Sequence, residues 1–165
     1  MRVMASGTFD IIHPGHGLYL EKAKELGGDN PYLIVVVAKD STVRKNKRNP
    51  IVNENQRLEM IKYLKPVDEA YLGYEDGDMF KIVREIKPDI IAIGPDQNFN
   101  TYKLESDLKD NGLNIKVIRV KDYHNSELDS SNKIIEKIKN MKKGEWNYGY
   151  CFCCRCKWIY WRRNT

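Results

Sequence analysis

A ten-residue run near the N-terminus combines residue types that suit phosphate chemistry. It covers residues 7–16 and reads Gly-Thr-Phe-Asp-Ile-Ile-His-Pro-Gly-His. Its two histidines, His13 and His16, are three residues apart across a Pro-Gly turn, so both imidazoles can face one phosphate. An imidazole near neutral pH can donate a hydrogen bond or carry a charge, and either helps a phosphoryl centre whose oxygens gain charge in the transition state. The alternative is two unrelated surface histidines. His124 stands alone and is interpreted as a loop residue.

Other features of this run also suit a polyphosphate ligand. Gly7 permits close approach of the backbone, and the N-terminus of the helix expected after the run attracts anions. Asp10 could serve as a metal ligand or as a turn former, and its residue type allows both.

The elements that must position this run alternate between strand and helix patterns. Five apolar or β-branched segments predict strands, at residues 3–5, 32–38, 67–72, 89–93 and 115–120. Five segments with helical spacing or capping signals predict helices, at residues 17–26, 53–65, 79–86, 101–111 and after Ser130 or Ser131.

This alternation predicts an α/β fold with a Rossmann-like, doubly wound sheet of five parallel strands in a single domain. Ligands bind such sheets at the carboxyl ends of the strands, near the point where the strand order reverses. The run at 7–16 follows the first predicted strand, and Gly94-Pro95-Asp96-Gln97 follows the fourth. A basic cluster within residues 43–49 follows the second strand. This cluster is either a solvated loop or a clamp for polyphosphate.

The pattern G-T-F-D-x-x-H-x-G-H is the signature of the HxGH cytidylyltransferase-like nucleotidyltransferases, and residues 1–143 resemble that class. Three stretches within it, at residues 38–43, 50–60 and 87–97, resemble the archaeal FAD synthases. The resemblance implies transfer of AMP from ATP to FMN with release of pyrophosphate. A related transferase, such as a glycerol-3-phosphate cytidylyltransferase, is the alternative. A non-catalytic nucleotide-binding or metal-binding protein is a second alternative.

The resemblance also implies the residues of the site. His13, His16 and Lys45 are the expected catalytic residues, with Lys45 placed in a loop after the second strand. The expected nucleotide contacts are His13 and His16 together with Thr8, Phe9, Asp10, Arg57, Gly94, Asp96, Gln97, Ser130 and Ser131. Lys45 and Arg57 would neutralise pyrophosphate. Each also has a simpler interpretation, Lys45 as a surface residue and Arg57 as a partner of Glu54 or Glu59 on its own helix.

The family further implies a divalent cation, expected to be Mg²⁺, that bridges phosphate oxygens with few protein ligands. Relatives also suggest a homodimer.

Two positions depart from the pattern. Asp129 stands where FAD synthases often have a cysteine, and Asn132 replaces a threonine or arginine. An added carboxylate near a triphosphate is unfavourable unless it binds metal or caps the helix.

Charge and hydropathy bear on partners and location. The net charge is +5, of which residues 144–165 contribute +3, so the body is nearly balanced and nucleic acid is not its expected partner. The longest apolar run, residues 33–38, is far shorter than the roughly 20 residues that cross a bilayer. With no charged-then-apolar leader, the expected location is the cytoplasm, with no membrane partner.

Residues 144–165 form a separate segment, rich in aromatic residues, that holds all four cysteines as C-x-C-C-x-C between Cys151 and Cys156. Structural zinc sites usually draw two pairs of cysteines from separate turns, so four thiolates within six residues give poor tetrahedral reach. The segment is therefore expected to be an appended tail outside the core domain of residues 1–143. Adventitious binding of a soft metal is the alternative.

Overall fold

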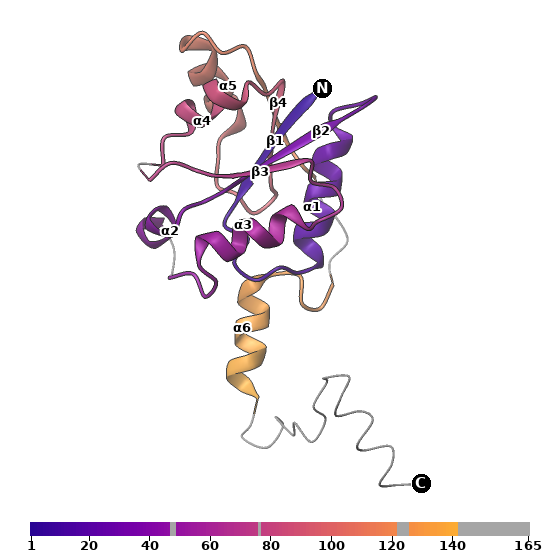
Figure 1. Cartoon of the computed structure of the whole chain (residues 1–165), viewed down its shortest axis with the longest axis vertical. Coiled ribbons are helices and arrows are strands. Elements are labelled where there is room, and N and C mark those ends of the chain that lie inside the picture. The colour runs from indigo at the N-terminus through magenta and orange to yellow at the C-terminus, as the bar shows by residue number, and fades with distance from the viewer. Residues whose placement is uncertain (47–48, 76, 122–125, 142–165) are drawn as a thin grey trace, which may run out of the picture. The chain divides into compact units, whose positions relative to one another are not determined.

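A computed structural model describes residues 1–46, 49–75, 77–121 and 126–141. Its contacts divide the chain into two compact units, Met1–Ser131 and Asn132–Thr165, and each unit is described by itself. The first unit contains the whole sheet and five of the helices (Figure 1). Among the described residues, no helix combines the length and the apolar character that a membrane span requires.

The sheet has five strands, all parallel, in the order β3-β2-β1-β4-β5. Their bounds are β1 Arg2–Gly7, β2 Tyr32–Val37, β3 Glu69–Leu72, β4 Ile90–Ile93 and β5 Lys116–Arg119. The parallel five-stranded fold is therefore confirmed. The order reverses between β1 and β4, so the carboxyl ends of these two strands mark the switch point at which ligands bind such sheets.

Two hydrophobic clusters cover the two faces of the sheet. Alternate residues of a strand point to opposite faces, so Val3 and Ala5 of β1 belong to one cluster, while Met4 belongs to the other. The first cluster includes Leu20 from α1, and the second includes Val83 from α4. This coverage on both sides is what the apolar strand patterns predicted.

The described residues form six helices. Their bounds are α1 Pro14–Glu25, α2 Asp40–Asn46, α3 Glu54–Lys62, α4 Met79–Ile86, α5 Thr101–Asp110 and α6 Ser131–Asn140. Five of them were predicted, and α1 begins three residues earlier than the predicted start at residue 17. Its first residue is Pro14, whose fixed φ and missing N–H suit the first turn of a helix.

Helix α2 was not predicted, and the placement of Lys45 in a loop is wrong. The helix carries Asp40 in its first turn, and Arg44 and Lys45 in its last turn. These charges complement the helix dipole at both ends. Val43 is buried, but it is the one apolar residue in this seven-residue helix, so the helix has no apolar stripe that a sequence pattern could reveal.

Candidate active site

The segment that leaves β1 places an aromatic ring against His16. Phe9 is almost completely buried and adopts a left-handed backbone conformation, with φ of 52°. A Cβ atom at Gly7 would lie 2.9 Å from the Phe9 ring, so the close approach expected at this glycine is made by that ring. The Phe9 ring in turn lies against His16, with ring centroids 5.1 Å apart. Gly7 therefore helps to position His16 through Phe9.

The two histidines of the motif form one stacked pair. Their ring centroids are 3.8 Å apart, and their planes are inclined by 27°. His13 is the extended residue that precedes α1, and its carbonyl accepts a hydrogen bond from the His16 N–H at 2.9 Å. Both imidazoles therefore lie at the N-terminus of a twelve-residue helix, where an anionic group is stabilised. Unrelated surface histidines would not produce this geometry.

Partial burial favours the neutral form of His13. Burial lowers its pKa below the usual 6.5, while the nearby carboxylates of Asp129 and Asp96 act in the opposite direction. Its Nδ1 atom is buried and has no hydrogen-bond partner among the residues that the structure describes. A neutral imidazole carries one N–H donor, and which ring nitrogen holds the proton depends on what the other contacts.

The loop before α6 closes over the start of α1. A Cβ atom at Gly15 would lie 2.6 Å from the carbonyl oxygen of Asp129, so this backbone approach requires glycine. Ser131 donates a hydrogen bond from Oγ to the Ile11 carbonyl at 3.4 Å, and Ser130 is the residue before it. The last loop, which holds the predicted residues Ser130 and Ser131, thus lies beside the histidine motif. Asp129 in this loop brings a carboxylate close to His13.

Asp10 joins two segments that are far apart in the sequence. Its buried Oδ1 accepts hydrogen bonds from the backbone N–H groups of Ile51 and Val52, both at 2.8 Å. Asp10 therefore fixes the segment before α3 against the loop after β1. Among the described residues, no cluster of three or more histidine, cysteine, aspartate or glutamate side chains could hold a metal ion.

Arg57, on α3, is buried and bonded within the protein. Its Nε donates to the Val52 carbonyl at 2.9 Å, its Nη1 donates to the Thr8 carbonyl, and its Nη2 donates to the Ala38 carbonyl at 2.8 Å. Nη2 also pairs with the Asp40 carboxylate at 2.6 Å. A buried charge needs a partner and hydrogen bonds of this kind.

These bonds tie together the loops after β1 and β2 and the segment before α3. The intrahelical pairing of Arg57 with Glu54 or Glu59 is wrong, since the partner is Asp40 on α2. Glu54 has another role, because its carboxylate accepts a hydrogen bond from the Asp40 N–H at 2.7 Å. The guanidinium expected to meet pyrophosphate is thus engaged by protein groups, as is the carbonyl of Thr8.

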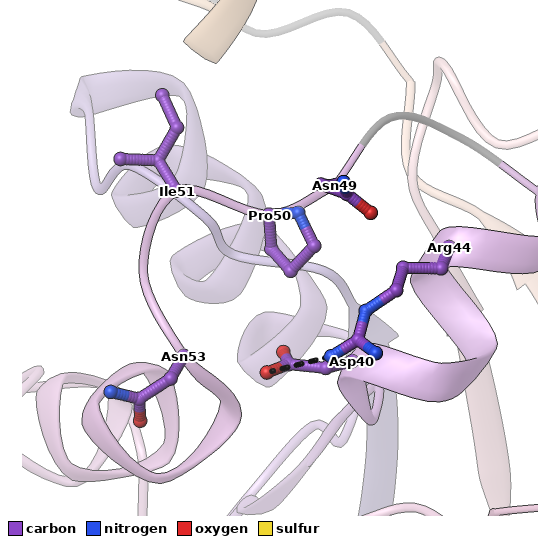
Figure 2. A pocket seen from close by; sticks show the side chains of 6 residues that line it. All are labelled: Asp40, Arg44, Asn49, Pro50, Ile51 and Asn53. Atoms are coloured by element: carbon purple, nitrogen blue, oxygen red, sulfur yellow. Dashed lines mark ion pairs between the residues drawn. The ribbon is translucent and has the colours of Figure 1, made fainter.

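A pocket of about 350 Å³ lies beside these loops (Figure 2). Six residues from α2 and the segment before α3 line it: Asp40, Arg44, Asn49, Pro50, Ile51 and Asn53. Arg44 makes a long ion pair with Asp40, at 3.9 Å, across one wall. The lining includes neither histidine, and Lys45 is exposed on α2.

The loop after β4 forms the other side of the switch point. The side chain of Gln97 accepts a hydrogen bond from the Gly94 N–H at 2.8 Å and donates one to the Ser6 carbonyl at 2.7 Å. This amide therefore joins the carboxyl ends of β4 and β1. Asp96, at the tip of the loop, is exposed and close enough to His13 to act on its pKa.

Two residues that the sequence reasoning missed hold this loop and the strand that precedes it in place. Arg119, the last residue of β5, donates to four carbonyl groups of the loop, and Tyr19 on α1 donates to the Ala92 carbonyl at 2.9 Å. A charged residue at the carboxyl end of a predicted buried strand was the available signal for Arg119. His124 and the cysteine segment lie outside the described residues.

Comparison with known proteins identifies the family to which the chain belongs. The cytidylyltransferase-like family model matches residues 4–137. FAD synthase of Methanothermus fervidus is 65% identical over 139 residues, which cover 84% of this chain and 95% of that protein. FAD synthase of Methanobrevibacter ruminantium is 64% identical over 140 residues, which cover 85% and 93% of the two chains.

A solved structure shares both sequence and fold. The lipopolysaccharide core biosynthesis protein of Thermoplasma volcanium matches with a TM-score of 0.71 and 50% identity, over 75% of this chain and 98% of that one. The chain therefore belongs to the cytidylyltransferase-like family of nucleotidyltransferases and, within that family, groups with the archaeal FAD synthases.

Proposed function

We propose that this protein is an FAD synthase, which transfers the AMP part of ATP to FMN and releases pyrophosphate. The observation that carries the proposal is the stacked pair of His13 and His16 at the N-terminus of α1, in a chain that matches FAD synthases over nearly their whole length.

The reaction needs positioning and charge stabilisation more than covalent chemistry by the protein. An oxygen of the FMN phosphate attacks the α-phosphorus of ATP in line, and the bond from that phosphorus to the leaving pyrophosphate oxygen breaks. His13 and His16 would donate hydrogen bonds to the oxygens that gain charge, with the dipole of α1 adding to their effect. A neutral His13 can do this with its single N–H.

The roles that we propose for the other predicted site residues follow from their positions around the switch point. Asp96 and the loop after β4 would receive the nucleotide on one side of the histidines, and Ser130 and Ser131 on the other. The exposed Lys45 on α2 is the predicted residue available to neutralise pyrophosphate. Arg57 would support the site indirectly, because its guanidinium is already hydrogen-bonded to the surrounding segments.

A divalent cation, which we propose is Mg²⁺, would neutralise the negative charge of the ATP phosphates. Mg²⁺ keeps several waters and is commonly held by substrate phosphates with one or two carboxylates, which suits a described site without a cluster of metal ligands. Asp10 stays a candidate ligand. We also propose that the enzyme is a cytoplasmic homodimer, and sedimentation of the purified full chain tests its oligomeric state.

The decisive experiment supplies the purified chain with ATP or CTP, together with FMN, riboflavin or glycerol 3-phosphate, and Mg²⁺. The expected result is FAD and pyrophosphate from ATP and FMN alone. A CDP-linked product from CTP and glycerol 3-phosphate would support the cytidylyltransferase alternative. FMN formed from riboflavin would contradict the choice of acceptor, and nucleotide binding without any product would support a non-catalytic protein.

A further inference from the structure

The side chain of Arg119 holds the loop after β4 by its backbone. Its Nη1 lies 2.8 Å from the Gly94 carbonyl oxygen, 3.3 Å from that of Pro95 and 2.9 Å from that of Gln97. Its Nη2 donates to the Phe99 carbonyl at 2.5 Å. One guanidinium thus gathers four carbonyl groups from six consecutive residues.

These contacts determine which way the peptide groups of the loop face. In a trans peptide the C=O and the next N–H point in opposite directions. Because the carbonyls of Pro95 and Gln97 face Arg119, the N–H groups of Asp96 and Asn98 point away from it. Arg119 reaches the loop from β5, so these donors are directed away from its guanidinium.

The same loop is anchored from the other side. Gln97 bonds to Ser6 at the end of β1, and Asp96 acts on the pKa of His13. The loop therefore lies between Arg119 and the histidine motif, at the switch point where a nucleotide binds.

We propose that Arg119 is a positioning residue for ATP binding. It holds the loop of residues 94–99 so that Asp96 and the outward N–H groups meet the nucleotide, and it contacts neither substrate nor the reacting atoms. This inference rests on the proposed function, since it names a residue that supports the nucleotide side of that site.

A planar guanidinium can donate to several carbonyls at once, which a lysine ammonium on a flexible stem cannot reproduce. Hydrogen bonds to charged groups are strong enough that losing this set is expected to raise the KM for ATP about tenfold or more. The variants are Arg119→Gln and Arg119→Lys. Arg84→Gln is the matched control, because Arg84 is exposed on α4 and its hydrogen bond to Asn111 is long, at 3.4 Å.

The measurements are kcat, the KM for ATP, the KM for FMN, and equilibrium binding of a non-hydrolysable ATP analogue. We expect both Arg119 variants to weaken ATP and analogue binding by similar factors, while kcat and the KM for FMN change little. Arg84→Gln should behave as the parent chain. If Arg119→Gln melts below the assay temperature, Arg119→Lys decides, because it retains the charge and the aliphatic stem.

Restoration of the parent KM for ATP by Arg119→Lys would overturn the proposal, because a simple positive charge would then suffice. A loss confined to kcat, or an equal rise in the KM for FMN, would also overturn it. If the parent chain makes no FAD, the proposed function fails, and the analogue-binding arm still tests Arg119 independently.

Discussion

The imidazole rings of His13 and His16 stack with their centroids 3.8 Å apart. Two positive charges at such a distance would repel strongly outside bulk water. The stack therefore disfavours a state in which both imidazole rings are protonated. Burial lowers the pKa of His13, which agrees with a neutral ring in this position. Under the proposed function, the pair would donate hydrogen bonds to phosphate oxygens with at most one of the two rings charged.

This arrangement predicts how stability depends on pH. Because the pKa of His13 is lower in the folded chain than the 6.5 of an unperturbed histidine, the unfolded chain binds more protons between these two values. The free energy of unfolding therefore falls as the pH drops below about 6.5 and recovers as the pH rises. Urea unfolding at pH 7.5 and 5.5 should show a smaller change for His13→Asn than for the parent chain. Equal changes in both proteins would contradict the lowered pKa.

Removing either imidazole should slow the reaction strongly. We expect His13→Ala and His16→Ala each to lose about 10²–10³-fold in kcat, the scale of one preorganised donor to a developing charge. His124→Ala, which removes the third histidine of the sequence, is the matched control and should keep parent activity. Melting temperatures measured alongside separate lost chemistry from lost folding. Parent turnover in both folded motif variants would remove the histidines from the mechanism.

Two glycines of α1 offer a matched pair of substitutions. Gly15→Ala would place its Cβ 2.6 Å from the Asp129 carbonyl oxygen, so the last loop must move. Because a small displacement of site residues slows catalysis, we expect kcat/KM to fall at least about tenfold. Gly17→Ala meets nothing within 4 Å and should keep its activity, with a gain of up to about 1 kcal/mol from helix propensity. Equal activity in the two variants would show that the contact between Gly15 and Asp129 does not matter.

The ion pair of Arg57 and Asp40 is expected to contribute mainly to the stability of the fold and not directly to the reaction. Removing one partner of a buried ion pair typically costs about 3–5 kcal/mol, because the other charge is left uncompensated. We therefore expect Arg57→Ala to lower the free energy of unfolding by that order, and Asp40→Asn to lower it by less, because a polar side chain remains there. Denaturant unfolding measures both. A stable Arg57→Ala variant whose sole defect is weaker inhibition by pyrophosphate would instead favour direct contact with phosphate.

The strands and five of the helices could be predicted because their patterns are local. Continuous apolar runs such as the one in β2 mark strands buried on both faces, and capping residues such as Asn53 mark helix starts. Helix α2 could not be predicted in this way, because its seven residues bury little. The histidine pair was found by residue type and spacing, which are also local signals.

The hydrogen-bond partners of Arg57 and Arg119 could not be predicted from the sequence. Arg57 and Ile61 are four residues apart and both buried, so Arg57 is on the inward face of α3 and cannot meet the exposed Glu59. Its partners are backbone carbonyls and Asp40, 17 residues earlier. Arg119 likewise bonds to carbonyl groups, which every residue carries. Such contacts depend on the tertiary fold and leave no pattern of residue types.

The last prediction concerns the cysteine segment, residues 144–165. The family model ends its match at residue 137, and α6 ends at Asn140, so both end before the segment begins. A chain that ends at Lys143 is therefore expected to fold and to retain parent kcat and KM values. The assay compares both chains for soluble yield, FAD formation and bound metal, and a full-length variant with all four cysteines changed to serine separates loss of the thiols from loss of the segment. If the shortened chain stays folded but makes no FAD, the segment contributes to the site, and the proposed domain boundary at residue 143 is wrong.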